Sequence, residues 1–354
     1  MAWPDGVEPR AVLLVRASHL GDVVHALPVF HALRARCPSA RIGWVVQPEF
    51  AGLLRGLPGL DALIPFERAR GARAWPPLLR ALRAFRADVC VDAQGNLKSA
   101  AITRLSRARL RVGLARADWR EPLGHRVLHA SAPPCDGPHA LDRMIGLARW
   151  IARDSALAPR RDPALAPAEL AAGRAQLEAL LPGSVAARPI VLHLSDARDV
   201  RGWPTAHWIE LARELARAGR PTLVISGPAE AALGAELARA VPAGPHIAHL
   251  VGQRGLRELA ALLAAAAARG ARLVACDSGP LHLACSVDLP TLALAGPQDP
   301  RRTGPYPPHA HRALTSPDEL ACRPCLARRC AHPRGPVCLS ELSPALVAAA
   351  CARD

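Results

Sequence analysis

The residues best suited to do chemistry lie in residues 276–283, which read Cys-Asp-Ser-Gly-Pro-Leu-His-Leu. This pattern predicts a strand that ends at a turn of small residues, followed by a helix that starts at the proline. Free amides at a helix start bind anions, and small residues let a diphosphate approach the backbone. We therefore interpret Asp277, Ser278 and Gly279 as an anion site, with His282 one turn into the helix. A half-buried histidine without a ligand is the alternative for His282.

Further phosphate-binding side chains are predicted in residues 193–204, between a strand and a helix. Ser195, Arg198 and Arg201 carry hydroxyl and guanidinium donors, which bind phosphate oxygens. Residues 296–300, which read Gly-Pro-Gln-Asp-Pro, follow the last predicted strand and are expected to turn beside the same ligand.

Asp22 is the candidate general base. It lies in residues 16–24, directly after the first predicted strand, where Gly21 lets the backbone turn closely. A carboxylate at this place could take a proton from a substrate hydroxyl at a cleft between two domains. The alternative is an ordinary helix cap, in which Asp22 accepts hydrogen bonds from the first free amides.

Two other polar segments follow predicted strands. Residues 92–99 hold Lys98, the sole lysine of a chain whose other cations are arginines. Residues 119–122 read Trp-Arg-Glu-Pro and contain Arg120, and taken alone they could be an ordinary polar loop.

Strands that alternate with helices must position these residues. Alternation at this spacing indicates parallel sheets with right-handed crossovers, which bind ligands beyond the carboxyl ends of their strands. We expect two doubly wound α/β domains facing each other across a cleft, residues 1–165 and 166–354, with a proline-rich linker and a helix (169–181) near the boundary. The predicted strands are residues 11–15, 41–46, 88–92, 190–194, 221–226, 272–276 and 291–295; the predicted helices are 23–36, 75–85, 205–218, 229–240 and 256–267.

The composition narrows the class of protein. The 354 residues carry 45 Lys and Arg against 30 Asp and Glu, a net charge of +15 that favours a phosphorylated substrate, an anionic membrane surface or nucleic acid. Nucleic-acid binding usually adds stacking aromatic residues, which number only 12 here. The most apolar stretch, residues 256–268, is shorter than the roughly 20 residues that a membrane span needs. We expect a cytosolic protein with reduced thiols.

Together these motifs resemble glycosyltransferase family 9, the lipopolysaccharide heptosyltransferases. Residues 18–28 (Ser-His-Leu-Gly-Asp-Val-Val-His-Ala-Leu-Pro) are similar to the family's opening signature, and residues 277–282 and 296–300 match its donor-binding half. Residues 92–101 and 120–122 look like the heptosyltransferase I branch.

The resemblance implies two Rossmann-like domains in the GT-B arrangement, with the acceptor on residues 1–165 and the ADP-sugar on residues 166–354. The implied reaction transfers L-glycero-D-manno-heptose from ADP-heptose to a Kdo sugar of a lipid A precursor, with inversion and without a cofactor or catalytic metal. The protein would then work as a peripheral protein on the cytoplasmic face of the inner membrane. Its oligomeric state is left open.

The resemblance also implies residue roles. Asp22 would be the base, and Arg201, where heptosyltransferase I has a lysine, would neutralise the diphosphate. Ser18, Lys98 and Arg120 would contact the acceptor. The remaining donor contacts would be Ser195, Asp277, Ser278, Gly279, His282 and Glu230, the last of these at the ribose. The pair Ser195-Asp196 stands where the family more usually has two threonines.

The end of the chain departs from heptosyltransferase I, although some other members of the family have similar Cys-rich ends. Cys322, Cys325, Cys330 and Cys338 have the spacing of a four-thiolate metal knuckle. A structural zinc site is one interpretation of this tail, residues 322–338. Reduced cysteines or a disulfide are the other.

Three other functions compete with this one. Another family 9 transferase would add a later heptose or a different sugar, and the donor motifs do not separate these cases. A dinucleotide-dependent oxidoreductase would need a Gly-x-Gly-x-x-Gly after the first strand, which residues 17–21 lack. A basic nucleic-acid-binding protein would show affinity that falls steeply with salt.

Overall fold

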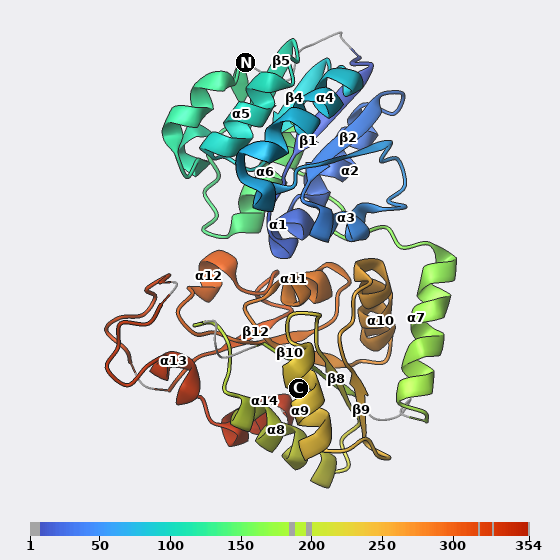
Figure 1. Ribbon diagram of the computed structural model, residues 1–354, viewed down its shortest axis with the longest axis vertical. Coiled ribbons are helices and arrows are strands. Elements are labelled where there is room, and N and C mark those ends of the chain that lie inside the picture. Colours follow the sequence, from blue (N-terminus) through green and yellow to red (C-terminus); the bar gives the residue numbers. More distant parts are fainter. Residues whose placement is uncertain (1–7, 184–187, 196–199, 318, 328, 353–354) are drawn as a thin grey trace. The chain divides into compact units, whose positions relative to one another are not determined.

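The structure is a computed structural model that describes residues 8–183, 188–195, 200–317, 319–327 and 329–352. The chain divides into two units, Met1–Ala164 and Leu165–Asp354. Each unit has its own parallel β-sheet with helices beside it (Figure 1). The prediction of an α/β fold with two Rossmann-like sheets is confirmed.

The first unit contains a sheet of six described strands in the order β3-β2-β1-β4-β5-β6. This order is the one typical of dinucleotide-binding folds, in which the chain reverses direction across the sheet between the first and fourth strands. The strands are β1 (Ala11–Val15), β2 (Arg41–Val46), β3 (Ala62–Pro65), β4 (Val89–Asp92), β5 (Leu110–Gly113) and β6 (Ala130–Ser131).

Helices cover this sheet on both faces, which explains why β1 is a continuous apolar run, buried along its whole length. On one face Leu13 and Val15 join a core with Leu82 and Phe85. The described helices and 3₁₀ turns of this unit are α1 (Leu20–His25), α2 (Leu27–Arg36), α3 (Pro48–Leu54), η1 (Arg68–Ala74), α4 (Trp75–Phe85), α5 (Leu97–Leu105), η2 (Arg116–Asp118), η3 (Pro122–Val127) and α6 (Ala140–Ala152).

The second unit repeats the same topology with the strand order β12-β11-β10-β7-β8-β9 among its described residues. The two central strands of this sheet are β7 and β10, which correspond to β1 and β4 of the first unit. The strands are β7 (Ile190–His193), β8 (Thr222–Ile225), β9 (Ile247–Leu250), β10 (Arg272–Cys276), β11 (Thr291–Leu294) and β12 (Arg312–Leu314).

The core of the second unit includes Trp203 and Trp208, which meet edge to face with ring centroids 4.9 Å apart. The indole of Trp203 donates to the Leu342 carbonyl at 2.9 Å and so ties the end of the chain to the sheet. The described helices are α7 (Pro167–Leu180), α8 (Thr205–Arg217), α9 (Ala231–Ala240), α10 (Leu256–Ala268), α11 (Gly279–Ser286), α12 (Pro300–Thr303), α13 (Val337–Ser340) and α14 (Pro344–Ala352).

Helix α7, which the sequence places near the boundary, packs on α10 of the second unit. Arg257 and Glu169 form an ion pair at 2.5 Å between the two helices. A side chain at Gly173 would place its Cβ 2.3 Å from the Ala261 carbonyl oxygen, so the glycine allows the helices to approach closely.

Most predicted elements agree with the structure to within one or two residues, and the strands at Ala11–Val15, Arg41–Val46 and Arg272–Cys276 agree fully. The prediction of a single helix over residues 23–36 is wrong. The structure has two helices there, α1 and α2, which meet at Ala26, and Pro28 lies in the first turn of the second. No helix among the described residues is both long and apolar enough to span a membrane.

Candidate active site

Several predicted site residues follow the strands at which the strand order of each sheet reverses, whereas Arg120 follows β5 and Glu230 follows β8. In the first unit β1 and β4 are neighbours, and in the second β7 and β10 are neighbours. Ligands of open α/β sheets bind beyond the carboxyl ends of the strands at such a point. Asp22 and Lys98 lie in the segments that follow β1 and β4, and Ser195 and Asp277 follow β7 and β10.

Asp22 lies in the first turn of α1 and forms an ion pair with Arg16. The Nη2 atom of Arg16 donates to Oδ1 of Asp22 at 2.6 Å, and 31% of the aspartate side chain is exposed. His19 occupies the N-cap position of α1, and no side chain makes a capping hydrogen bond at this helix start. The alternative that Asp22 is an N-cap is therefore wrong.

Arg16 is 8% exposed and is held from two sides. Its Nη1 donates to the Ala93 carbonyl, and its own carbonyl accepts from the Trp44 indole at 3.0 Å. Buried charges of this kind are stable only when they are paired and hydrogen-bonded. The sequence interpretation did not single out Arg16, although an arginine six residues before the candidate base was a visible signal.

The loops after β1 and β4 are joined by the side chain of Gln94. Its amide nitrogen donates to the hydroxyl of Ser18 at 2.8 Å, and its amide oxygen accepts from the Ala17 backbone at 2.8 Å. Ser18, predicted at the acceptor, is half-buried and fixed by this contact. Gln94 was not among the predicted site residues.

Asp92 organises the loop that carries Lys98. Its fully buried carboxylate accepts from the amides of Gln94 and Gly95, both at 2.9 Å, and from the Thr103 hydroxyl at 3.2 Å. Burial raises the pKa of Asp92 above its ordinary value, and these hydrogen bonds oppose the rise. Lys98 then lies in the first turn of α5 with its side chain exposed.

Residues 92–99 and residues 119–122, which are separate segments in the sequence, lie against each other in the structure. The Arg120 backbone donates to the Gly95 carbonyl at 2.8 Å, and Glu121 accepts from the Leu97 amide at 3.1 Å. The guanidinium of Arg120 is 80% exposed, with Glu121 3.8 Å away. Lys98 and Arg120 are thus two exposed cations on adjoining segments.

In the second unit, Ser278 occupies the N-cap position of α11, but its side chain makes no capping hydrogen bond. Its hydroxyl oxygen is buried and has no hydrogen-bond partner in the described structure. Gly279 follows as the first residue of the helix. A buried polar atom without a partner is costly, so a ligand that binds this hydroxyl would relieve a cost already present.

Ser195 presents a second hydroxyl of the same kind, buried and without a partner among the described residues. It lies two residues beyond His193, which pairs with Ala275, and Asp277 lies two residues beyond Ala275. The two serines therefore follow neighbouring strands at nearly the same level of the sheet.

His282 is only 8% exposed, and its Nε2 lies 3.4 Å from Oδ1 of Asp277. Glu230 follows β8 at the N-cap position of α9 and is half-buried. Arg201 is exposed in the segment that leads to α8. Arg198 and Asp196 lie outside the described residues.

The Cys-rich tail forms no metal cluster in the part of the chain that is described. Cys322, Cys325 and Cys330 are exposed, whereas Cys338 is buried, and all four thiols are free. Burial raises the pKa of Cys338, and the other three cysteines add to the rise. A four-thiolate site for these residues stays a prediction.

Comparison with known proteins gives a family match. Residues 75–334 match glycosyltransferase family 9 (heptosyltransferase). The chain is 30% identical to lipopolysaccharide heptosyltransferase 1 of Pseudomonas aeruginosa, in an alignment that covers 95% of this chain and 96% of that protein. It is also 30% identical to lipopolysaccharide heptosyltransferase 1 of Escherichia coli K12, covering 83% and 90%. The structure of E. coli heptosyltransferase WaaC with ADP aligns with a TM-score of 0.71 and 27% identity over 95% of this chain and 97% of that one.

Proposed function

The chain belongs to glycosyltransferase family 9, and from this membership we propose that it is an ADP-heptose:lipopolysaccharide heptosyltransferase of the heptosyltransferase I type. It would move L-glycero-D-manno-heptose from ADP-heptose to a Kdo sugar of the inner core. The observation that carries the proposal is the near full-length similarity to heptosyltransferase 1, joined to polar residues at the reversal point of both sheets.

We assign the donor to the second unit. The start of α11 offers free amides to a diphosphate, and Ser195 and Ser278 offer hydroxyls that lack partners among the described residues. Arg201 would add a guanidinium that binds diphosphate oxygens in two places. Asp277, Gly279 and His282 would complete the donor site, and Glu230 would contact the ribose.

The reaction assigned to these residues is a direct displacement at the anomeric carbon. A Kdo hydroxyl attacks this carbon while the bond to the ADP oxygen breaks, so the configuration inverts. Asp22 takes the hydroxyl proton, and the negative charge that develops on ADP is met by Arg201 and the amides at the start of α11. Arg16 orients the Asp22 carboxylate through its 2.6 Å contact.

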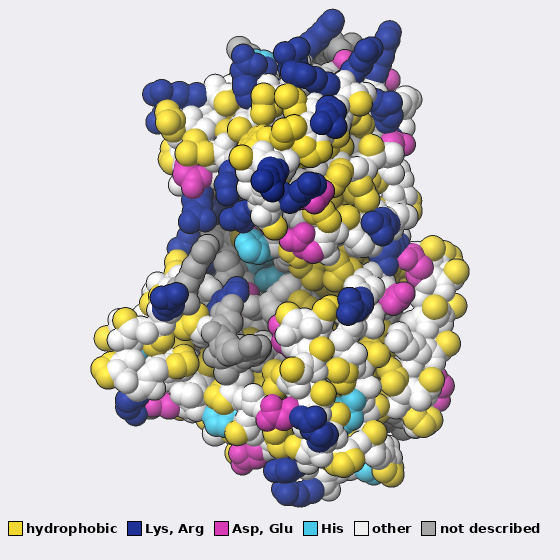
Figure 2. Space-filling view, viewed as in Figure 1, with side chains coloured by type: hydrophobic (Ala, Val, Ile, Leu, Met, Phe, Trp, Pro, Cys, Tyr) yellow, Lys and Arg dark blue, Asp and Glu magenta, His cyan; other side chains and the backbone are white. Residues whose placement is uncertain are grey.

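We assign the acceptor to the first unit, where most of the positive charge lies. Residues 1–164 hold 25 Lys and Arg against 14 Asp and Glu, a net +11, whereas residues 165–354 hold 20 against 16, a net +4. Basic side chains are spread over the face of the first unit seen in Figure 2. This charge suits an acceptor with acidic sugars and phosphates at an anionic membrane surface, on the cytoplasmic side of the inner membrane.

One experiment tests both the reaction and the acceptor. The protein is incubated with ADP-heptose and one of two acceptors, lipid A bearing only Kdo or the same molecule already bearing one heptose. We expect ADP release and one added heptose on the first acceptor alone. Transfer only to the second acceptor would assign a later step, and no transfer to either would overturn the proposal.

A further inference from the structure

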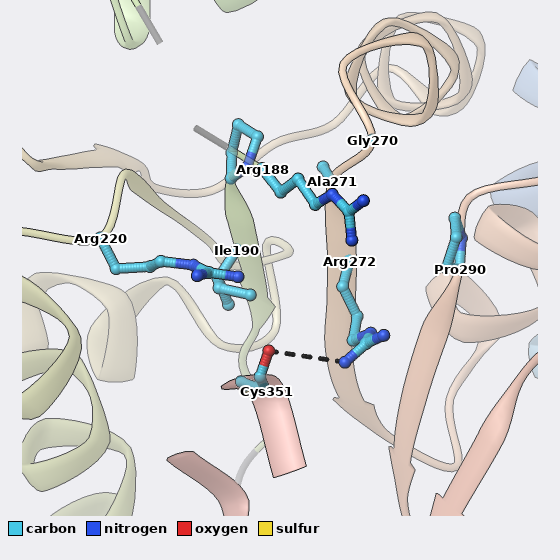
Figure 3. A pocket seen from close by; sticks show the side chains of 9 residues that line it. Arg188, Ile190, Arg220, Gly270, Ala271, Arg272, Pro290 and Cys351 are labelled. Carbon is cyan, nitrogen blue, oxygen red and sulfur yellow. Dashed lines mark hydrogen bonds between the residues drawn. The ribbon is translucent and has the colours of Figure 1, made fainter. Parts of the chain in front are cut away.

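The second unit has a cavity of about 250 Å³ at the amino-terminal edge of its sheet, the edge opposite to the predicted donor residues. Three arginines line it, Arg188, Arg220 and Arg272 (Figure 3). Cys351, near the end of α14, lines it as well, and none of the described lining residues is acidic.

The register of the sheet explains why the three arginines meet. Arg272 is the first residue of β10 and pairs with Ile190, the first residue of β7, which in turn pairs with Thr222 at the start of β8. Arg188 and Arg220 each stand two residues before their strand. Adjacent parallel strands therefore begin side by side, and each one brings an arginine to the same edge.

Contacts with neighbouring residues hold Arg272 and Arg188 at the cavity. Nη1 of Arg272 donates to the carbonyls of Ala350 and Cys351 at 3.1 and 3.5 Å, which lie in the last turn of α14. A cation is favoured at a helix carboxyl end. The stem of Arg188 lies close to Gly270, at which a Cβ would be 3.6 Å from the arginine Cγ.

Two further observations concern the charges at the cavity. Nε of Arg220 is buried and has no hydrogen-bond partner among the described residues. The cations of Arg272 and Arg220 lower the pKa of the Cys351 thiol, although burial outweighs them and raises it to about 11. The carboxylate of Glu214 in α8 adds to the rise in the pKa of Cys351. Three guanidiniums line one small cavity, so an anion that binds there is attracted by each of them.

We propose that this three-arginine pocket is a binding site for a phosphate group, either inorganic phosphate or a small phosphomonoester. Guanidinium groups bind phosphate oxygens through paired N–H donors, and a phosphate dianion would be attracted by all three. A cavity of about 250 Å³ has room for one such group. The site is separate from the predicted diphosphate site because it lies at the other end of β7 and β10.

The test is calorimetric titration of the full-length protein with inorganic phosphate in the presence of saturating ADP. We expect one phosphate to bind under these conditions. Arg220→Gln and Arg188→Gln should each weaken binding at least tenfold, while Arg239→Gln, an exposed arginine on α9, should leave it unchanged. Near-ultraviolet circular dichroism checks that each variant is folded, and the two pocket variants serve as independent tests.

Three outcomes would overturn the proposal: no phosphate binding with or without ADP, phosphate binding that ADP abolishes, or binding that neither pocket variant weakens. Failure of heptose transfer would leave all of these results unaffected.

Discussion

Arg16 and Asp22 form an ion pair in which Nη2 of the arginine lies 2.6 Å from Oδ1 of the aspartate. The arginine follows the central strand of the first sheet, and the aspartate lies in the first turn of the helix after it. Because the arginine is buried and the carboxylate is partly exposed, the pair fixes a charged oxygen at the sheet edge where a ligand would bind.

The first prediction concerns Asp22 as the base. Asp22→Asn should lower kcat by about 10²- to 10⁴-fold, which is the usual contribution of a general base, and should leave ADP affinity unchanged. Single-turnover rates and calorimetry measure the two effects. Asp61→Asn is the matched control, since Asp61 is also paired with an arginine, Arg34, at 2.8 Å. A wild-type rate in the Asp22 variant would remove Asp22 from the chemistry.

The second prediction is that Arg16 affects catalysis by positioning the carboxylate of Asp22. Arg16→Gln should lower kcat by roughly tenfold or more, because a charge-assisted hydrogen bond contributes about 1.5–3 kcal/mol. In the Asp22→Asn background the same change should have little further effect on kcat. A double-mutant cycle measures this coupling, and additive effects would mean that Arg16 does not act through Asp22.

The third prediction concerns the diphosphate. Arg201→Ala should lower kcat with ADP-heptose by about 10²-fold, since it removes one group that stabilises charge on the leaving ADP. Arg201→Lys should recover part of this loss. Arg217→Ala, an exposed arginine at the end of α8, is the control. Equal rates for the two alanine variants would exclude Arg201 from the site.

The fourth prediction tests the acceptor side through the sole lysine. Lys98→Ala should raise the KM for the Kdo-bearing acceptor by roughly fivefold, equivalent to about 1 kcal/mol for an exposed charge contact. The KM for ADP-heptose should not change, and the difference between variant and wild type should shrink in high salt. Arg104→Ala, at the other end of α5, should behave as the wild type.

The fifth prediction is a pH dependence of stability at the end of β7. Burial lowers the pKa of His193 to about 4, from an ordinary value of 6.5. The unfolded chain therefore takes up this proton first as the pH falls, so the contribution to stability is complete above pH 6.5 and is lost between pH 6.5 and 4. The loss amounts to roughly 3 kcal/mol.

Urea unfolding at pH 7 and pH 5 measures this effect. His193→Leu should lose less stability than the wild type over that interval, because the leucine does not titrate. The other titrating groups contribute equally to both proteins, so the difference isolates His193. Parallel pH profiles for the two proteins would show that the buried imidazole has an ordinary pKa.

The elements that position the site could be read from the sequence because they are simple patterns. Apolar runs such as residues 11–15 are buried on both faces and bounded by polar residues, so the strand and its end are both visible. The segments after the strands were then recognisable as ligand loops. Short strands were not predicted where the pattern is weak, as at Ala130–Ser131, which has two residues and is half-buried.

The contacts within the site could not be read in the same way. The roles of Arg16, Gln94 and Asp92 depend on loops about 77 residues apart in the chain, and only the pairing of β1 with β4 brings them together. The break at Ala26 was missed because both helices on either side of it are apolar on their buried face. The three-arginine pocket likewise depends on strand register, which no local pattern encodes.

The equal strand order of the two sheets gives each described strand of one unit a counterpart in the other unit. Under the proposed roles, Asp22 and Arg201 are counterparts, since each follows the first strand of its half and precedes the next long helix. The proposed base and the proposed charge stabiliser would therefore occupy equivalent positions in the two topologies. If the proposed assignments hold, substitutions that change the acceptor contacts would fall in one unit and substitutions that change the ADP contacts would fall in the other.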